Sequence, residues 1–230
     1  MIPDTSLAKR AILRRIRSAQ GHGDPSKASP ADRARVEQRD AYLAARPRGK
    51  GPSVGADLLD HFCEQAQRMA SSVERVSGYA DVPQAVLRYL ITHQLSLRVA
   101  AWPLLSTIDF SVAAAESPSF EVEFRAPRGD DLVGLGGAFA GIAETGTLML
   151  LSAADRPAST HLLPETHIAL LPVDRVVAHY EDAFALMRAE YGEPPRAMNL
   201  VSGPSRTADI EQTLVMGAHG PYRVHIVLIG

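Results

Sequence analysis

The chain has 230 residues, of which 46% are hydrophobic and 22% are charged, a balance typical of a soluble globular protein. A membrane span and a disulfide framework are both excluded, because no apolar run approaches the roughly 20 residues that cross a bilayer and Cys63 is the single cysteine. The amino-terminal segment lacks the continuous apolar stretch of a secretory signal. We therefore expect a cytoplasmic protein.

The charge is distributed unevenly along the chain. Residues 1–54 contain 12 Lys and Arg against 5 Asp and Glu, whereas the remainder contains 12 against 21. A basic segment of this kind binds nucleic acid or an acidic protein surface. Tyr42 is its single aromatic residue, so it offers no platform on which bases could stack. We expect docking on an acidic protein surface and no nucleic acid.

The basic segment predicts two helices and a linker. Apolar residues recur at helical spacing within 5–19, and Gly and Pro interrupt the pattern afterwards. Ser29, Pro30 and Asp32 form the start signal of a second helix, over about 30–45. The stretch RPRGKGPSVG lacks periodicity and is typical of a linker. We therefore divide the chain into a basic helical arm with its linker, 1–54, and an α/β domain, 55–230.

From residue 56 onward, short apolar strands alternate with amphipathic helices. This pattern predicts a mostly parallel sheet covered by helices on both faces, a three-layer α/β/α sandwich. The carboxyl-terminal strand ends the sequence without a tail, and we expect it well inside the sheet. The expected helices are 56–70, 82–94 and 175–191, and the expected strands are 73–77, 97–102, 119–124, 167–173, 197–201 and 222–230.

The middle of the domain carries a glycine-rich stretch, VGLGGAFAGIAETGTLMLLSA. Apolar residues flank ETG, and Gly146 can adopt the positive φ of a tight turn, which predicts a β-hairpin with Glu144 near its tip. A carboxylate held between buried strands can act as a base or a nucleophile, although an exposed acid at a hairpin tip is the plain alternative. The glycines do not form a dinucleotide fingerprint, since Phe139 occupies the position of its last glycine.

The stretch SGPSRTADIE, residues 202–211, follows the predicted strand AMNLV. We expect it at the carboxyl-terminal edge of the sheet, where ligands of α/β proteins bind. Ser205 or Thr207 can cap a short helix whose first N–H groups attract an anion, and Arg206 can pair with a carboxylate or phosphate. Asp209 could orient Arg206 or act as an acid or base. The alternative is a capped helix with a surface ion pair.

One histidine is a further candidate for an acid or base in the site. His219, within GAHGP, can titrate near neutral pH, although the sequence favours a structural histidine in a turn. His161 and His167 do not have the spacing of metal ligands, and we expect no metal site. The histidines expected to be structural are His61, His93, His179 and His225.

In this order and spacing, GIAETGTLMLLS, LLPETHIALLPVDRVV and LVSGPSRTADIEQTLVMGAHGPYRVHIVLIG resemble the LUD-domain family, in particular its lactate utilization protein C or YkgG type. The resemblance covers about 56–230. It implies a fold similar to that of sugar-phosphate isomerases and coenzyme A transferases, with Glu144 at the position of the transferase glutamate. The serine–glutamate–asparagine–glycine motif of the coenzyme A transferases is absent from this sequence.

The resemblance also implies a role in oxidising L-lactate to pyruvate together with iron–sulfur partner subunits, with no cofactor in this chain. Glu144 or His219 would accept the hydroxyl proton. The substrate-binding candidates are Gly146, Thr147, Ser202, Gly203, Ser205, Arg206 and Thr207. Two alternatives stay open: a stand-alone enzyme for a phosphate- or acyl-bearing small molecule, and a regulatory subunit that binds a small acid without chemistry.

Overall fold

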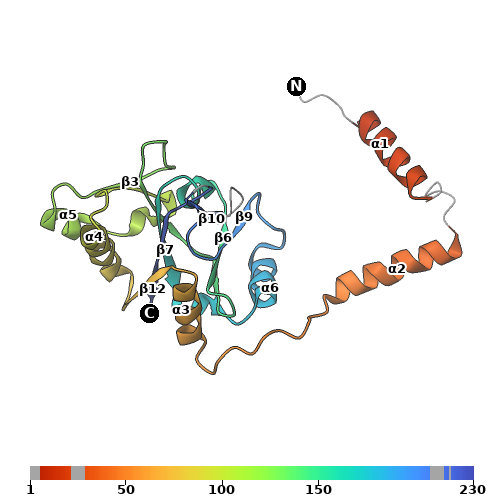
Figure 1. The fold of residues 1–230 in the computed structure, drawn as a ribbon, viewed down its shortest axis with the longest axis horizontal. Helices are drawn as coiled ribbons and strands as arrows, with labels where there is room; N and C mark the ends of the chain where they lie inside the picture. Colours follow the sequence, from red (N-terminus) through yellow and green to blue (C-terminus); the bar gives the residue numbers. More distant parts are fainter. Residues whose placement is uncertain (1–5, 22–28, 208–214, 218) are drawn as a thin grey trace. The chain divides into compact units, whose positions relative to one another are not determined.

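The computed structural model describes residues 6–21, 29–207, 215–217 and 219–230 (Figure 1). The chain forms two compact units, 1–50 and 51–230. Among the described residues, no helix is long and apolar enough to cross a membrane.

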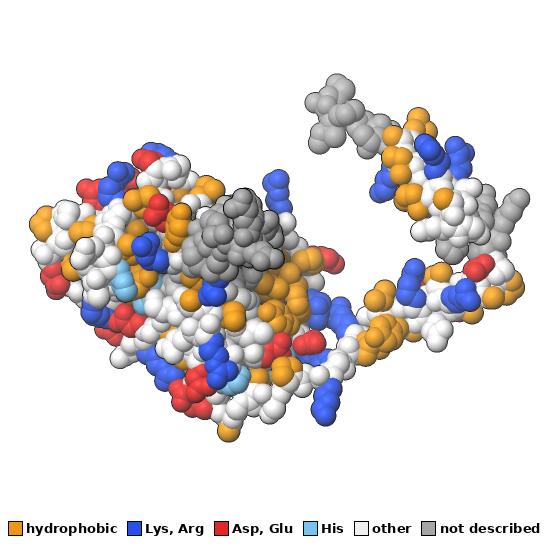
Figure 2. Space-filling model, in the orientation of Figure 1, with side chains coloured by type: hydrophobic (Ala, Val, Ile, Leu, Met, Phe, Trp, Pro, Cys, Tyr) orange, Lys and Arg blue, Asp and Glu red, His pale blue; other side chains and the backbone are white. Residues whose placement is uncertain are grey.

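The first unit consists of helices α1, Ser6–Ala19, and α2, Pro30–Ala45. The predicted start of α2 is confirmed, because the Asp32 N–H donates to Ser29 Oγ at 3.2 Å and the Ser29 N–H donates to the Asp32 carboxylate at 3.1 Å. Neither helix has a buried residue among those described. Figure 2 shows hydrophobic and basic side chains side by side on both helices.

The second unit is built around a six-stranded sheet in which every neighbouring pair is parallel. The last strand pairs on both sides, so its predicted place inside the sheet is confirmed. In spatial order, the strands are β1 (Ser72–Val76), β12 (Arg223–Ile229), β7 (Thr166–Pro172), β4 (Val133–Gly137), β2 (Arg98–Ala101) and β3 (Glu121–Phe124).

Helices α4, Val82–Thr92, and α5, Ser111–Glu116, cover one face of this sheet (Figure 1). Their apolar sides, including Val86 and Leu90, pack on sheet residues such as Ile168 and Val227 in one continuous buried cluster. Burial of this apolar surface is the main stabilisation of the layer, at about 25 cal/mol per Å² removed from water.

The opposite face carries helix α3, Leu58–Arg68, and a second sheet of four short strands. Its strands are, in spatial order, β8 (Val176–Val177), β5 (Ala140–Ile142), β6 (Thr147–Leu151) and β9 (Met198–Val201). Helix α6, Tyr180–Tyr191, packs through Ala183 and Met187 on the outside of the second sheet. The predicted α/β sheet with helices on both sides is therefore confirmed, with an additional sheet inserted on one side.

Two predictions about this second sheet were wrong. The stretch AMNLV was assigned to the parallel sheet, but β9 pairs antiparallel with β6. Residues 176–177 were assigned to the start of a helix, but they form β8, which pairs parallel with β5. Both segments pair with the predicted hairpin, which is confirmed as β5 and β6.

The remaining elements are short. The two-residue strands β10, Arg206–Thr207, and β11, Val215–Met216, pair antiparallel. Short 3-10 helices are η2 (Tyr79–Asp81), η3 (Pro103–Thr107), η4 (Ala158–His161) and η5 (Val173–Arg175).

A partly buried ion pair fixes the loop between β3 and β4. Arg125 donates to both carboxylate oxygens of Asp131, at 2.6 and 3.0 Å, and Asp131 also accepts from the Arg128 N–H at 2.6 Å. These bonds, led by the one to Arg125, hold the pKa of Asp131 below its usual range. We expect Asp131→Asn to lower the free energy of unfolding by about 2 kcal/mol, because it removes the charge from these bonds. Urea denaturation at neutral pH measures this loss, and an unchanged midpoint and slope would contradict it.

Candidate functional site

The β5–β6 turn places Glu144 beside the start of α6. The Ala143 N–H donates to Val177 O at 2.8 Å and the Glu144 N–H donates to Ala178 O at 3.1 Å, so the backbone of the turn continues the sheet. Gly146 has a φ of +65° and packs directly on α3, where a Cβ would lie 2.1 Å from the Ala66 nitrogen. The turn is therefore held from both sides, and Glu144 has a fixed position.

Glu144 pairs with His179. Its Oε2 lies 2.5 Å from His179 Nδ1, and the two side chains are 13% and 25% exposed. His179 is the N-cap residue of α6, and its N–H donates to the Asp182 carboxylate at 3.1 Å, which fixes the backbone that carries the ring. A carboxylate that holds one imidazole nitrogen orients the ring for proton transfer at the other. The pair can thus take or give a proton.

A cluster of hydroxyl groups adjoins this turn. Thr147 Oγ1 is fully buried and lies 2.7 Å from Thr145 Oγ1, 2.9 Å from the Tyr180 hydroxyl and 2.6 Å from Ser202 Oγ. The cluster joins the hairpin, α6 and the loop after β9. The structure therefore brings the predicted Thr147 and Ser202 into contact and adds Thr145 and Tyr180, which were not predicted from the sequence.

The loop that carries Ser202 and Arg206 lies at the other edge of the sheet from the one predicted. Arg206 Nη2 donates to Met69 O at 2.6 Å, and Gly203, with a φ of +76°, lies so close that a Cβ would be 1.9 Å from the same oxygen. Met69 precedes β1, so this is the amino-terminal edge of the parallel strands. The expectation of a carboxyl-edge site was wrong, because β9 belongs to the antiparallel sheet.

The structure brings Gly217 and residues 219–221 next to this loop. The Gly217 N–H donates to Ser205 O at 2.9 Å, the His219 N–H donates to Ser205 Oγ at 3.3 Å, and the Ser205 N–H donates to Pro221 O at 2.9 Å. His219 and Ser205, both predicted site residues, are therefore neighbours. Arg206 and Thr207 form β10, whereas Asp209 and the rest of the predicted helix lie outside the described residues.

The predicted site residues thus divide between two places. Glu144 and Thr147 lie with His179 at the hairpin turn, while Ser205, Arg206 and His219 lie at the amino-terminal edge, and Ser202 connects them through Thr147. The sequence pattern predicted His179 inside a helix, as a structural residue. Asp182 follows it by three residues, which is the spacing of a helix start, and this signal could have identified the cap.

Three other histidines are buried in the sheet region and remain uncharged at neutral pH. Burial lowers the pKa of His161 to about 4, that of His167 to about 3 and that of His225 to about 4. His161 Nε2 lies 2.9 Å from Asn199 Nδ2, and His225 Nδ1 lies 2.9 Å from Ser72 Oγ. No group of three potential metal ligands is assembled in the part of the chain that the structure describes.

The model of the LUD domain matches residues 59–229, which include the hairpin, the Glu144–His179 pair and the Arg206 loop. The chain belongs to the LUD domain family. The resemblance predicted from the motifs around Glu144, Arg206 and His219 is therefore confirmed, and this match spans most of the LUD protein's second unit.

Several curated proteins are similar to this LUD protein. Lactate utilization protein C of Bacillus licheniformis is 37% identical over 91 residues, 38% of each chain. The protein of that name from Exiguobacterium sp. is 34% identical over 137 residues, 57% of each chain. An uncharacterized protein of Neisseria meningitidis serogroup B is 40% identical over 96 residues, 42% of this chain and 41% of its own. The matches thus span 38–57% of these relatives' lengths.

A solved structure shares the fold. The crystal structure of a DUF162 family protein from Deinococcus radiodurans superposes with a TM-score of 0.53, covering 78% of this chain and 100% of that one. At 22% identity, this likeness shows the α/β fold alone.

Proposed function

We propose that this LUD protein is a component of an L-lactate utilization system and supports the oxidation of L-lactate to pyruvate together with iron–sulfur partner subunits. The observation that carries this proposal is its similarity to proteins named lactate utilization protein C, at 34–37% identity over part of the chain. The family match over 59–229 supports the same role.

The Glu144–His179 pair is the group best suited to the proton chemistry. Oxidation of a 2-hydroxy acid removes the hydroxyl proton, a second proton and two electrons, and forms the C=O bond of the product. In the proposal, the pair accepts the hydroxyl proton, since its carboxylate and imidazole are 2.5 Å apart and both partly exposed. His219 stays the predicted alternative acceptor, and Arg206 stays the predicted partner of the substrate carboxylate.

The electrons require an acceptor outside this chain. An iron–sulfur cluster is ordinarily held by four cysteine thiolates, and the chain has one cysteine, Cys63, which is half-buried and accepts from Arg75 Nη2 at 3.4 Å. A single cysteine does not provide the ligands of an iron–sulfur cluster, which supports the assignment of the redox centres to partner subunits.

Growth of a strain that lacks this gene tests both the process and the site. We expect no growth on L-lactate with an empty vector and full growth with the wild-type chain. Glu144→Gln should grow like the empty vector, because losing an acid–base group lowers turnover by about 10²- to 10⁴-fold. The exposed Glu193→Gln is the matched control and should grow normally.

The possible outcomes distinguish the proposed role in lactate utilization from the proposed roles of the site residues. Lactate growth without the gene would contradict the proposed function as a whole. Normal growth of Glu144→Gln, expressed at the wild-type level, would contradict the role of the pair alone. Arg206→Ala tests the predicted carboxylate partner in the same strain. Purification from lactate-grown cells should also yield a cysteine-rich partner, and turnover by the isolated chain would instead favour the stand-alone enzyme.

A further inference from the structure

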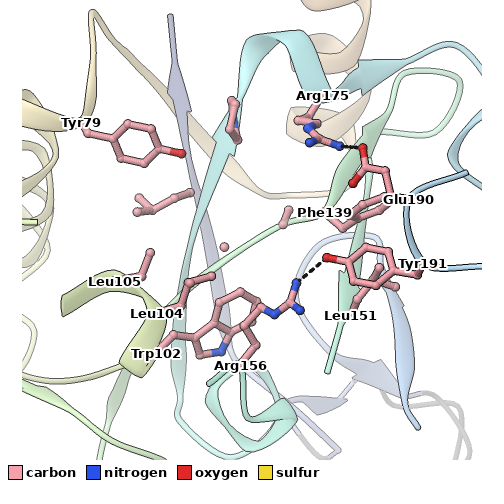
Figure 3. Close-up of a pocket in the computed structure, with 14 residues that line it drawn as sticks. Tyr79, Trp102, Leu104, Leu105, Phe139, Leu151, Arg156, Arg175, Glu190 and Tyr191 are labelled. Carbon is pink, nitrogen blue, oxygen red and sulfur yellow. Dashed lines mark hydrogen bonds and ion pairs between the residues drawn. The ribbon is translucent and has the colours of Figure 1, made fainter. Parts of the chain in front are cut away.

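A cavity of about 210 Å³ lies at the carboxyl-terminal ends of β2, β4 and β7 (Figure 3). Trp102 follows β2, Phe139 follows β4 and Pro172 ends β7, and all three line the cavity. This is the edge at which parallel α/β sheets bind their ligands. It is opposite to the edge that holds Arg206, and the cavity contains none of the residues selected from the sequence.

The walls of the cavity are largely apolar and one of them is rigid. The Trp102 indole N–H donates to Pro157 O at 3.2 Å, which fixes the ring. Gly136 and Gly137 lie beneath the indole, since an added Cβ would be 3.0 and 3.4 Å from its nearest ring atoms. Further apolar lining residues are Tyr79, Leu104, Leu105, Phe139, Leu151 and Leu170. Such a site favours a ligand with a flat or apolar body.

Arg156 supplies a positive charge with a fixed orientation. Its guanidinium lies over the Tyr191 ring, 5.6 Å from the centroid, and Nη1 donates to the Tyr191 hydroxyl at 2.9 Å (Figure 3). Nε is buried and lies 3.5 Å from the Asp155 carboxylate without a hydrogen bond among the described residues. Asp155 is about half exposed, so water screens its charge. The guanidinium therefore retains donors that suit an anion.

The second arginine of the cavity is already neutralised. Arg175 Nη1 donates to Glu190 Oε1 at 2.5 Å, and its guanidinium lies 5.5 Å from the centroid of the Phe139 ring. The Glu190 carboxylate also lines the cavity and repels additional negative charge. One available guanidinium beside a fixed carboxylate suits a single carboxylate group and disfavours a phosphate dianion.

We propose that this cavity binds a small monocarboxylate with an apolar body, with the carboxylate on Arg156 and the body against Trp102. The volume of about 210 Å³ lies below the roughly 300 Å³ at which pockets for drug-sized ligands begin, so the ligand has few heavy atoms. The inference goes beyond the proposed function and does not rest on it, since the cavity uses neither Glu144 nor Arg206.

Trp102 reports binding directly, because it is the single tryptophan of the chain and forms a wall of the cavity. Tryptophan emission of the full chain is followed during titration with isobutyrate, which does not absorb where tryptophan is excited. Isobutyramide has the same shape without the charge and serves as the matched ligand. We expect a saturable change in emission with isobutyrate and a response at least tenfold weaker with isobutyramide.

Variants test whether Arg156 is the residue that binds the carboxylate of isobutyrate. Arg156→Gln should weaken isobutyrate binding at least tenfold, Arg156→Lys should keep part of the preference for the charged ligand, and the exposed Arg196→Gln should bind like the wild type. Tyr191→Phe keeps the ring but removes the acceptor that orients Arg156, and should weaken binding a few-fold. Thermal melts monitor folding of each variant.

Four results would overturn the proposal. The first three are no saturable response to isobutyrate in the wild type, an equal response to isobutyramide, and unchanged isobutyrate binding in folded Arg156→Gln and Tyr191→Phe. Loss of isobutyrate binding in Arg206→Ala with retention in Arg156→Gln would move the site to the amino-terminal edge and overturn it as well. None of these results depends on lactate growth, so failure of this proposal and failure of the proposed function are distinguishable.

Discussion

Lowering the pH from about 6.5 to about 4.5 is expected to destabilise the chain steeply, by about 1.4 kcal/mol per pH unit for each buried histidine. Burial lowers the pKa of His161 and His225 to about 4 and that of His167 to about 3. In the unfolded chain a histidine has a pKa of about 6.5. At a pH between this value and the lower pKa values of the folded state, the unfolded chain therefore holds more protons than the folded chain. The free energy that the neutral buried histidines contribute to stability is therefore fully present above about pH 6.5 and is lost as the pH falls.

The environments of the three rings explain why the folded state resists protonation. His167 lies on β7 with both ring nitrogens buried and without a hydrogen-bond partner among the described residues, and the His161 ring is 5.7 Å away. A charge on either imidazole disfavours a charge on the other. His225 stacks on Tyr89 at 3.8 Å, and although the Glu74 carboxylate lies 3.7 Å from its Nε2, burial dominates the pKa.

Urea denaturation at a series of pH values measures this loss. His167→Phe replaces the ring by an apolar one and should flatten the dependence between pH 6.5 and 4.5 by about 1.4 kcal/mol per pH unit. Ile91→Phe, a change of an exposed residue on α4 that has no ionisable group, is the control and should leave the slope as in the wild type. An unchanged slope in folded His167→Phe would contradict the assignment.

Most helices and strands could be predicted from the sequence because their signals are local. Strand β4, Val133–Gly137, was not predicted, because its glycine-rich sequence lacks the apolar pattern of a strand. The apolar run of β7 and the Ser29–Asp32 spacing of α2 fix those elements without reference to the rest of the chain. The second sheet could not be predicted in this way. An apolar run such as β9 reads the same in either sheet, and its antiparallel pairing with β6 depends on contacts about fifty residues apart.

The same limit applies to the candidate site. The hairpin turn and the position of Glu144 in it follow from ETG between apolar strands. The partner of Glu144 is His179, 35 residues later, and no periodicity connects the two. The loop with Arg206 was assigned to the wrong edge of the sheet because the direction of β9 was unknown, and the cavity beside Trp102 is lined by residues from many separate elements.

Gly146→Ala is expected to lower the free energy of unfolding by about 2–5 kcal/mol. The residue has a φ of +65°, which costs an L-residue about 1–2 kcal/mol, and the added Cβ would lie 2.1 Å from the Ala66 nitrogen and 2.5 Å from the Gln65 carbonyl carbon. Both are backbone atoms of α3, which cannot turn aside as a flexible side chain could. The turn or the helix must therefore move.

Gly192→Ala separates the two contributions. Gly192 has a φ of +72° and a ψ of −66°, which is strained for an L-residue, but an added Cβ would meet no atom within 4 Å, so this variant should lose the conformational part alone. Urea denaturation of both variants at neutral pH gives the difference that belongs to the contact with α3. Equal losses in the two variants would show that the hairpin turn is not held against α3. A larger loss in Gly146→Ala, together with lost lactate growth when the variant is folded at a permissive temperature, would tie the position of Glu144 to this contact.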